Sequence, residues 1–336
     1  MSEMMRRVKL VEPQKLTIER VEIPKPASGE ALIKVKACGV CGTDLHAYRG
    51  EHPFISCPIV LGHEFSGIMV ETGKHVVVEP SLVCGECYNC KTGRYNICEN
   101  LRVIGCQTDG AFAEYIAVPS SKVFPIPDDI PFEEAALVEP AAVGVHAVEQ
   151  ADLRKGNRVV IIGSGTIGLM VLQAAKAFGA GETIITDVLD PRLELARELG
   201  ADYAINAKET DPVRWIHDTF GRDGIDKVFE CVGGSQSVTV NQAIQLARKG
   251  TRIVVVGVFE RKLPVEIGLV QDRELELVGS LMYKGNDFSE AIDLIHKGKI
   301  NAKRLISKIF PLEKAEEAIK LLEKEKGDII KIVLKP

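Results

Sequence analysis

The sequence has no long apolar run, no excess of basic charge and no secretory signal. No stretch approaches the roughly 20 apolar residues that a membrane-spanning helix needs. With 42 Lys and Arg against 47 Asp and Glu, the chain lacks the basic excess of proteins that grip nucleic acid or anionic lipid. Residues 1–7 (MSEMMRR) contain no apolar signal core. These absences predict a cytoplasmic protein with no nucleic-acid or membrane partner.

Cysteine is concentrated in one short segment. Four of the nine cysteines are Cys84, Cys87, Cys90 and Cys98. In a reducing compartment such crowding favours metal binding over disulfides. The spacing C-x2-C-x2-C-x7-C allows four thiolates to surround one zinc with no position left for a substrate, which predicts a structural zinc. An iron–sulfur cluster and a nucleic-acid zinc knuckle are alternatives, but the chain has no companion redox motif and few basic residues nearby.

The hydrophobic pattern of residues 1–125 is that of short β-strands. Glycine and proline separate runs such as 31–37, 68–71 and 75–79, and Thr72-Gly73 supplies a tight turn between the last two. No helix is expected in this region. It therefore predicts a compact, mostly antiparallel β domain.

From about residue 153 the pattern changes to alternating strands and helices, beginning with strand 158–162 and helix 167–178. Short apolar strands separated by helical periods are typical of a doubly wound parallel sheet. After residue 287 two amphipathic helices precede a final strand at 329–334, which can rejoin the first domain. The length of 336 residues agrees with two domains of roughly 100 to 200 residues each.

A glycine-rich turn lies between the first of these strands and its helix. Gly163, Gly165 and Gly168 form G-x-G-x-x-G, and Asp187 lies 24 residues after Gly163 at the end of the next strand. Such glycines let the backbone approach a pyrophosphate at the helix N-terminus. The carboxylate of Asp187 would bind the ribose hydroxyls and repel a 2′-phosphate, which favours NAD, whereas the nearby Arg192 keeps NADP open. The alternative is a structural turn followed by an incidental acid.

Three further segments, residues 41–46, 62–64 and 139–140, carry potential metal ligands, but each is weak evidence alone. Cys38 and Cys41 form C-x-x-C, yet a thioredoxin-type site needs a βαβ unit that this β-rich region lacks. The pair His63-Glu64 is not a metalloprotease motif, because Gly67 stands where the second His would be. A single buried His is more often a core residue than a ligand.

Taken together, these motifs resemble the zinc-dependent medium-chain alcohol and polyol dehydrogenases over nearly the whole chain. The segments that carry the resemblance are residues 41–46, 62–67, the four-cysteine lobe, 109–115, 139–140 and 163–168. The resemblance implies an α/β protein with a GroES-like β-rich catalytic domain at 1–150 and 287–336, which includes the zinc lobe at 84–98. It also implies a Rossmann NAD-binding domain at 151–286, an active site in the cleft and a homo-oligomer.

The resemblance further implies a catalytic zinc held by Cys41, His63, Glu64 and Glu139, in addition to the structural zinc. Glutamate at 139 is similar to the sorbitol, threonine and butanediol dehydrogenase branch, in which Glu64 coordinates and Glu139 binds directly or through water. Two carboxylates that compete for one position suggest exchange during turnover.

In the implied mechanism, Thr43 takes the proton of the alcohol and relays it through the cofactor ribose to His46 and solvent. Hydride passes to the nicotinamide, and Asp44 orients His63. The coenzyme-binding residues implied are Gly163, Gly165, Thr166, Ile167, Gly168, Asp187, Arg192 and Val232.

Two departures from the family pattern bear on function. The segment between the G-H-E motif and the first lobe cysteine is shorter by roughly ten residues than the family usually has, so a short hairpin at 71–79 is expected to remove a surface loop without touching the ligands. Met282 replaces the Arg that precedes the tyrosine at position 283 in sorbitol dehydrogenases. The expected substrate is therefore a secondary alcohol with a neighbouring polar group, such as a polyol, sugar-derived alcohol or diol.

Three other functions remain as alternatives. L-Threonine 3-dehydrogenase is the nearest, since a β-hydroxy amino acid also presents a secondary alcohol beside a polar group. A zinc-free reductase or nucleotide-binding protein on the same fold has no need for Cys41, Thr43, His46 and His63 together. A nucleic-acid binder built on the zinc lobe would show salt-sensitive association.

Overall fold

The computed structural model describes residues 3–325 and 327–336, which divide into two compact units. Unit 1 comprises Met1–Glu139, Lys284–His296 and Ala302–Pro336, and unit 2 comprises Pro140–Tyr283 and Lys297–Asn301. Helix α4 (Val138–Gln150) crosses the division, so residues 140–150, expected with the first domain, fall in unit 2. Among the described residues, no helix combines the length and apolarity needed to cross a membrane.

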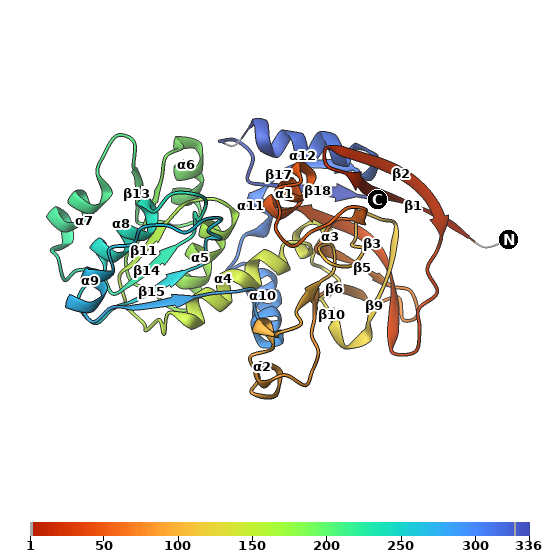
Figure 1. The fold of residues 1–336 in the computed structure, drawn as a ribbon, viewed down its shortest axis with the longest axis horizontal. Coiled ribbons are helices and arrows are strands. Elements are labelled where there is room, and N and C mark those ends of the chain that lie inside the picture. The colour runs from red at the N-terminus through yellow and green to blue at the C-terminus, as the bar shows by residue number, and fades with distance from the viewer. Residues whose placement is uncertain (1–2, 326) are drawn as a thin grey trace. The chain divides into compact units, whose positions relative to one another are not determined.

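Unit 1 is built on a mixed seven-stranded sheet. Its strand order is β10-β6-β5-β3-β18-β17, with β9 also paired to β3. Figure 1 shows the C-terminal strand β18 and helix α12 among the N-terminal strands. The sheet strands are β3 (Glu30–Val40), β5 (Glu64–Met69), β6 (His75–Val78), β9 (Tyr115–Pro119), β10 (Val123–Pro125), β17 (Ile306–Pro311) and β18 (Lys331–Lys335).

Two smaller sheets complete the strands of unit 1. One has the order β2-β1-β4, and the other pairs β7 with β8. These strands are β1 (Met4–Glu12), β2 (Lys15–Glu22), β4 (Ile59–Val60), β7 (Ser81–Leu82) and β8 (Arg102–Val103). The helices of unit 1 are α1 (Gly42–Arg49), α2 (Tyr88–Lys91), α3 (Phe132–Ala135), α10 (Gly285–His296), α11 (Ala302–Leu305) and α12 (Ala315–Lys324).

The sheet of unit 1 confirms two predictions and corrects one. The short hairpin is present, since β5 pairs with β6 antiparallel and the backbone N–H of Gly73, whose φ is 71°, donates to the carbonyl of Met69. The tail strand does rejoin this unit, beside β3. The expectation of a helix-free segment is wrong, because α1 follows β3 directly. Asp44 at the third helical position is the capping signal that predicts this helix.

Unit 2 confirms the predicted doubly wound domain. Its six strands are all parallel, in the order β13-β12-β11-β14-β15-β16. Helices flank the sheet (Figure 1), and every residue of β11 is buried, as expected for a sheet covered on both faces. The strands are β11 (Val159–Ile162), β12 (Thr183–Asp187), β13 (Tyr203–Asn206), β14 (Lys227–Glu230), β15 (Arg252–Val255) and β16 (Glu276–Gly279). The helices are α5 (Thr166–Ala177), α6 (Asp190–Glu198), α7 (Pro212–Phe220), α8 (Val238–Leu246) and α9 (Ile267–Asp272).

Each unit has its own apolar core. In unit 1 the core includes Ile33, Phe65 and Ile332, from three different strands, and Leu61 from the segment between β4 and β5. In unit 2 it includes Val160, Ile184, Val228 and Ile253 from adjacent parallel strands. Burial of such side chains contributes about 1.5–3 kcal/mol each and holds the strand ends, where the predicted site residues lie, in fixed positions.

Candidate active site and coenzyme site

The four cysteines of the lobe converge on one point. Cys87 caps the N-terminus of α2, Cys90 lies within that helix, and Cys98 follows a single 3-10 turn. The Sγ atom of Cys84 lies 3.5 Å from that of Cys98 and 3.9 Å from that of Cys90, and the Sγ atoms of Cys87 and Cys98 are 3.9 Å apart. Sulfurs bound tetrahedrally to one zinc at about 2.3 Å lie roughly 3.8 Å from one another. The lobe therefore fits one zinc ion.

Backbone N–H groups of the lobe point at these sulfurs. Cys84 N donates to Cys98 Sγ over 3.3 Å, and Cys87 N donates to Cys84 Sγ over 3.4 Å. Hydrogen bonds from the backbone of Glu86 and Cys87 lower the pKa of the Cys84 thiol to about 6. Hydrogen bonds thus lower the pKa of Cys84 and Cys87 and favour their thiolates, the form that binds zinc, whereas burial raises the pKa of Cys90 to about 12.

A second cluster begins at the N-terminus of α1. Cys41 is the N-cap residue, and its backbone N–H donates to the Asp44 carboxylate over 2.8 Å. The other carboxylate oxygen of Asp44 lies 3.4 Å from the backbone nitrogen of Gly62, directly before His63. Asp44 therefore holds the backbone beside two of the predicted ligands. Its approach to the His63 ring is 3.9 Å, which is longer than a hydrogen bond, so the structure replaces the expected side-chain contact with backbone contacts.

Strands β3 and β5 bring His63 and Glu64 to Cys41. Glu64 begins β5 opposite Gly39 of β3, and Cys41 follows the end of β3. The Cys41 sulfur, a ring nitrogen of His63 and a carboxylate oxygen of Glu64 lie within 4.8 Å of one another. His63 and Glu64 are 7% and 1% exposed. A half-buried sulfur with a buried nitrogen and a buried oxygen is a ligand set that fits zinc.

The charge around His63 also favours a bound cation. Its Nδ1 atom is buried and has no hydrogen-bond partner among the described residues. Burial lowers the pKa of His63, but hydrogen bonds with Cys106 and Cys41, together with the negative charges of Cys41 and Asp44, raise it well above its ordinary value. An environment that attracts a proton this strongly also stabilises a metal cation.

Sequence reasoning missed one side chain of this cluster, Lys331 of β18. Its Nζ atom lies 2.7 and 2.8 Å from the two carboxylate oxygens of Glu64. The missed signal is a charged residue at the start of an apolar strand that is otherwise buried. Burial lowers the pKa of Lys331, but the charges of Glu64, Cys41 and Glu139 and the hydrogen bond with Glu64 outweigh it and raise the pKa.

The other predicted catalytic residues lie around this cluster. The hydroxyl oxygen of Thr43 is 3.7 Å from the Cys41 sulfur. His46 lies one turn further along α1, with its side chain 40% exposed. Glu139, near the start of α4, is outside the 4.8 Å cluster but close enough to raise the pKa of Lys331.

In unit 2 the glycine-rich turn lies where the strand order reverses, between β11 and β14. Gly163 follows β11 with a φ of 98°, and Gly165 caps α5. A Cβ atom on Gly168 would collide with the carbonyl oxygen of Gly163. The predicted residues Thr166 and Ile167 form the first turn of α5. Dinucleotides bind at such a point, with the pyrophosphate at the helix N-terminus.

Asp187 ends β12 beside this turn. Its carboxylate accepts hydrogen bonds from Ser164 N at 2.7 Å, Val188 N at 2.7 Å and Leu189 N at 3.1 Å. A carboxylate has about four acceptor positions, so one remains for a ribose hydroxyl. Arg192 lies close by, and its buried Nε atom has no hydrogen-bond partner among the described residues.

Val232 lies on the other side of the turn. It follows β14, is 52% exposed, and its methyl group would lie 2.6 Å from a Cβ atom on Gly163. The Glu230 carboxylate accepts hydrogen bonds from Val232 N and Gly233 N, both at 3.0 Å. Sequence reasoning did not single out Glu230, which holds the loop that carries Val232.

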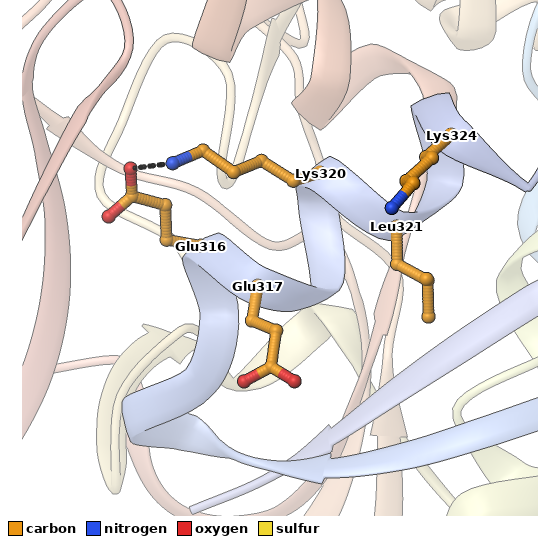
Figure 2. Close-up of a pocket in the computed structure, with 5 residues that line it drawn as sticks. All are labelled: Glu316, Glu317, Lys320, Leu321 and Lys324. Carbon is orange, nitrogen blue, oxygen red and sulfur yellow. Dashed lines mark ion pairs between the residues drawn. The ribbon is translucent and has the colours of Figure 1, made fainter.

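A surface hollow of about 460 Å³ lies away from these clusters, along α12. Figure 2 shows its lining, Glu316, Glu317, Lys320, Leu321 and Lys324, all from that one helix. The Glu316 carboxylate and the Lys320 ammonium are 2.8 Å apart. These residues form the solvent-facing side of one helix, and their polar groups do not converge on a point where a ligand could bind.

Comparison with known proteins identifies two domains in the chain. The alcohol dehydrogenase GroES-like domain matches residues 27–128, and the zinc-binding dehydrogenase domain matches residues 166–297. Sorbitol dehydrogenase of Bacillus subtilis is 34% identical over 96% of this chain and 95% of its own length. L-Threonine 3-dehydrogenase of Bacillus velezensis is 35% identical over 95% of each chain.

Solved structures extend the similarity to the fold. RspB of Escherichia coli CFT073, in complex with NADH, has a TM-score of 0.92 and 32% identity over 99% of each chain. A zinc-binding dehydrogenase of Sinorhizobium meliloti bound to NADP has a TM-score of 0.91 and 34% identity over 100% of each chain.

The chain belongs to the zinc-type medium-chain alcohol dehydrogenases. It is accordingly an NAD(P)-dependent oxidoreductase that acts on CH–OH groups, with a GroES-like domain and a Rossmann domain. The family and the fold expected from the sequence motifs are confirmed.

Proposed function

We propose that this enzyme oxidises a secondary alcohol with a neighbouring polar group, such as a polyol or diol, to a ketone, with NAD as hydride acceptor. The observation that carries the proposal is the convergence of the Cys41 sulfur, a His63 nitrogen and a Glu64 oxygen within 4.8 Å. Sorbitol dehydrogenase among the relatives supports a polyol substrate.

We propose Cys41, His63 and Glu64 as ligands of a catalytic zinc, with Glu139 as a fourth carboxylate that binds directly or through water. Zinc held there would supply Lewis acidity, which lowers the pKa of an alcohol hydroxyl. The protein must then accept and remove the proton. The Thr43 hydroxyl lies beside the Cys41 sulfur, and the half-exposed His46 on the same helix can pass a proton to water.

The structural zinc is assigned to Cys84, Cys87, Cys90 and Cys98, whose sulfur separations support the assignment. NAD is assigned to the Gly163–Gly168 turn, Asp187, Arg192 and Val232. A negative carboxylate at 187 disfavours a 2′-phosphate. The structure with NADP bound shows that this family also holds the other coenzyme, and the unpartnered Arg192 Nε would be its recognition group.

L-Threonine 3-dehydrogenase activity is the second candidate, favoured by the similarity to the Bacillus velezensis enzyme of that name. Initial rates with sorbitol, 2,3-butanediol and L-threonine, each with NAD and with NADP, separate the candidates. The highest kcat/KM should fall on a polyol or diol with NAD. Metal analysis should find two zincs per chain, and a fully active enzyme with fewer than two would contradict the proposal.

We also propose a cytoplasmic homo-oligomer. All nine cysteines are free thiols, which suits a reducing compartment. Strand β16 is an edge strand of its sheet with Leu277 37% exposed, and such an edge favours pairing with a second copy. Light scattering coupled to size-exclusion chromatography measures the molar mass, and a monomer at micromolar concentration would refute the oligomer.

A further inference from the structure

Lys331 and Glu64 form an ion pair that is almost entirely closed to solvent. The two side chains are 3% and 2% exposed, and the Lys331 ammonium contacts both carboxylate oxygens of Glu64. The same ammonium lies 3.4 Å from the carbonyl oxygen of Val40. These contacts of the ammonium are with β5 and β3, which carry or precede the proposed ligands.

The order of strands explains how the two side chains meet. β3 lies between β5 and β18, with Gly39 opposite Glu64 on one side and Val40 opposite Ile332 on the other. A Cβ atom at position 39 would collide with a Glu64 carboxylate oxygen. A glycine in the central strand thus opens the space through which the lysine reaches the carboxylate.

The ion pair lowers the net negative charge that the proposed ligands present to a metal. The proposed ligands Cys41 and Glu64 carry two negative charges, enough to cancel those of zinc, and His63 is neutral when it binds a metal. The Lys331 ammonium offsets one of these two negative charges. It also contacts both oxygens of Glu64, so a metal shares this carboxylate with the ammonium and is held less firmly by it.

We propose that Lys331 is a positioning residue of the catalytic metal centre, which restrains Glu64 from binding the metal firmly and leaves the ion with a net positive charge. This inference rests on the proposed function. It extends that function by making the C-terminal strand part of the active site. The restraint keeps a coordination position open to the substrate, and the retained charge strengthens the pull on the hydroxyl.

The test is the rate at which the catalytic-site metal leaves to a chelator, together with the ligand-field spectrum of the Co²⁺-substituted protein. In Lys331→Met, Glu64 should bind the metal without competition, so release should slow by about tenfold and the spectrum should change. A purely structural defect would instead speed release. The kcat should fall by about tenfold with a smaller change in KM, and Lys331→Arg, which keeps the charge, should restore part of it.

Lys335→Met is the matched control, because Lys335 lies on the same strand, is 51% exposed and pairs with Glu133. It should behave as the wild type. Release from Lys331→Met as fast as from this control, with an unchanged Co²⁺ spectrum, would overturn the inference.

A second comparison covers the case in which Lys331→Met does not fold, since removal of one partner leaves a buried charge unpaired. Glu64→Gln and the double variant Glu64→Gln/Lys331→Met leave no such carboxylate, and in the first the Lys331 ammonium keeps the Val40 carbonyl and the new amide oxygen as acceptors. If Lys331 acts through Glu64, these two proteins should release metal at the same rate and share one Co²⁺ spectrum. A difference between them of more than about threefold would refute the inference.

Failure of the proposed function would give results that differ from failure of the role of Lys331 alone. A wild-type protein that binds only one metal, or that keeps both metals in Cys41→Ser, contradicts the catalytic centre itself. Two metals in the wild type and one in Cys41→Ser, combined with no effect at Lys331, contradicts only the role of the lysine.

Discussion

At the scale of single residues, Cys41 shows how a ligand can be prepared by the backbone. It follows the last residue of β3 and is the N-cap residue of α1, and its backbone N–H donates a hydrogen bond to the Asp44 carboxylate. The same carboxylate reaches the N–H group before His63. One buried acid thus holds two chain segments that approach each other from different strands. Removal of the sulfur itself would leave this framework intact.

Cys41→Ser should therefore abolish turnover, with a loss of at least about a thousandfold in kcat, while the fold persists. Metal analysis should find one zinc per chain, and calorimetry should find unchanged NAD affinity, since the coenzyme turn belongs to the other unit. Cys57→Ser, a change at a half-buried thiol outside both clusters, is the control. Loss of both metals together would show that the two zinc sites are not separate.

Asp187 is the residue that we propose sets coenzyme choice. Asp187→Ser removes the negative charge that repels a 2′-phosphate and leaves the charge of Arg192 uncompensated. The ratio of kcat/KM for NAD over NADP should fall by about a hundredfold. Asp190→Ser, a change at an exposed neighbour that accepts a hydrogen bond from Asn206, should leave the ratio unchanged. An unchanged ratio in Asp187→Ser would remove this carboxylate from coenzyme recognition.

At the scale of elements, the zinc lobe is a short loop and helix whose geometry depends on the ionisation of its thiols. The pKa of Cys84 is lowered from 9.0 to about 6 by backbone hydrogen bonds. The unfolded chain still holds this proton between those two pH values, whereas the folded lobe has lost it. The stabilisation that this gives is present in full above pH 9 and is lost as the pH falls through about 6.

The fraction of zinc retained by the lobe should also fall as the pH falls. Protein desalted at a series of pH values should keep its lobe zinc above about pH 6 and lose it increasingly below, as its thiolates are protonated. Measurement in Cys41→Ser isolates the lobe metal from the catalytic one. Retention of lobe zinc that does not vary down to pH 4 would contradict thiolate control.

Elements also show what the sequence can and cannot predict. The first Rossmann strand, expected at 158–162 and found at 159–162, and the glycine turn after it are predictable because each is defined by a local apolar run and local turn chemistry. Strand β16 was not predicted. Helix α1 was missed because the β pattern around it dominated, although Asp44 carries its cap signal. Lys331 could not be assigned to Glu64 from pattern alone, since their contact depends on which strands neighbour β3.

At the scale of the whole molecule, the two units divide the chemistry. The four-cysteine lobe and the cluster of Cys41, His63 and Glu64 lie in unit 1, whereas the residues proposed for the coenzyme lie in unit 2. The single tryptophan of the chain, Trp215, also lies in unit 2, where its ring packs against Tyr203 and Phe220. Its fluorescence therefore reports on one unit alone.

Removal of both zincs should abolish the function of unit 1 while leaving the coenzyme binding of unit 2 unchanged. Chelator-treated protein should bind NAD with an affinity within about twofold of the holoprotein, and Trp215 emission should keep its maximum, while turnover is lost. Re-addition of zinc should restore turnover. Loss of NAD binding on metal removal would show that the coenzyme unit depends on the metal-bearing one.

The position of β18 has a consequence for biosynthesis. Strand β18 is synthesised after every other described strand, yet it lies beside β3 of the N-terminal sheet. The coenzyme unit is complete by Asn301, whereas the sheet of unit 1 cannot be completed until β18 has left the ribosome. Domains generally fold as units as they emerge. The unit whose strands are encoded first is thus completed after the unit encoded in the middle of the chain.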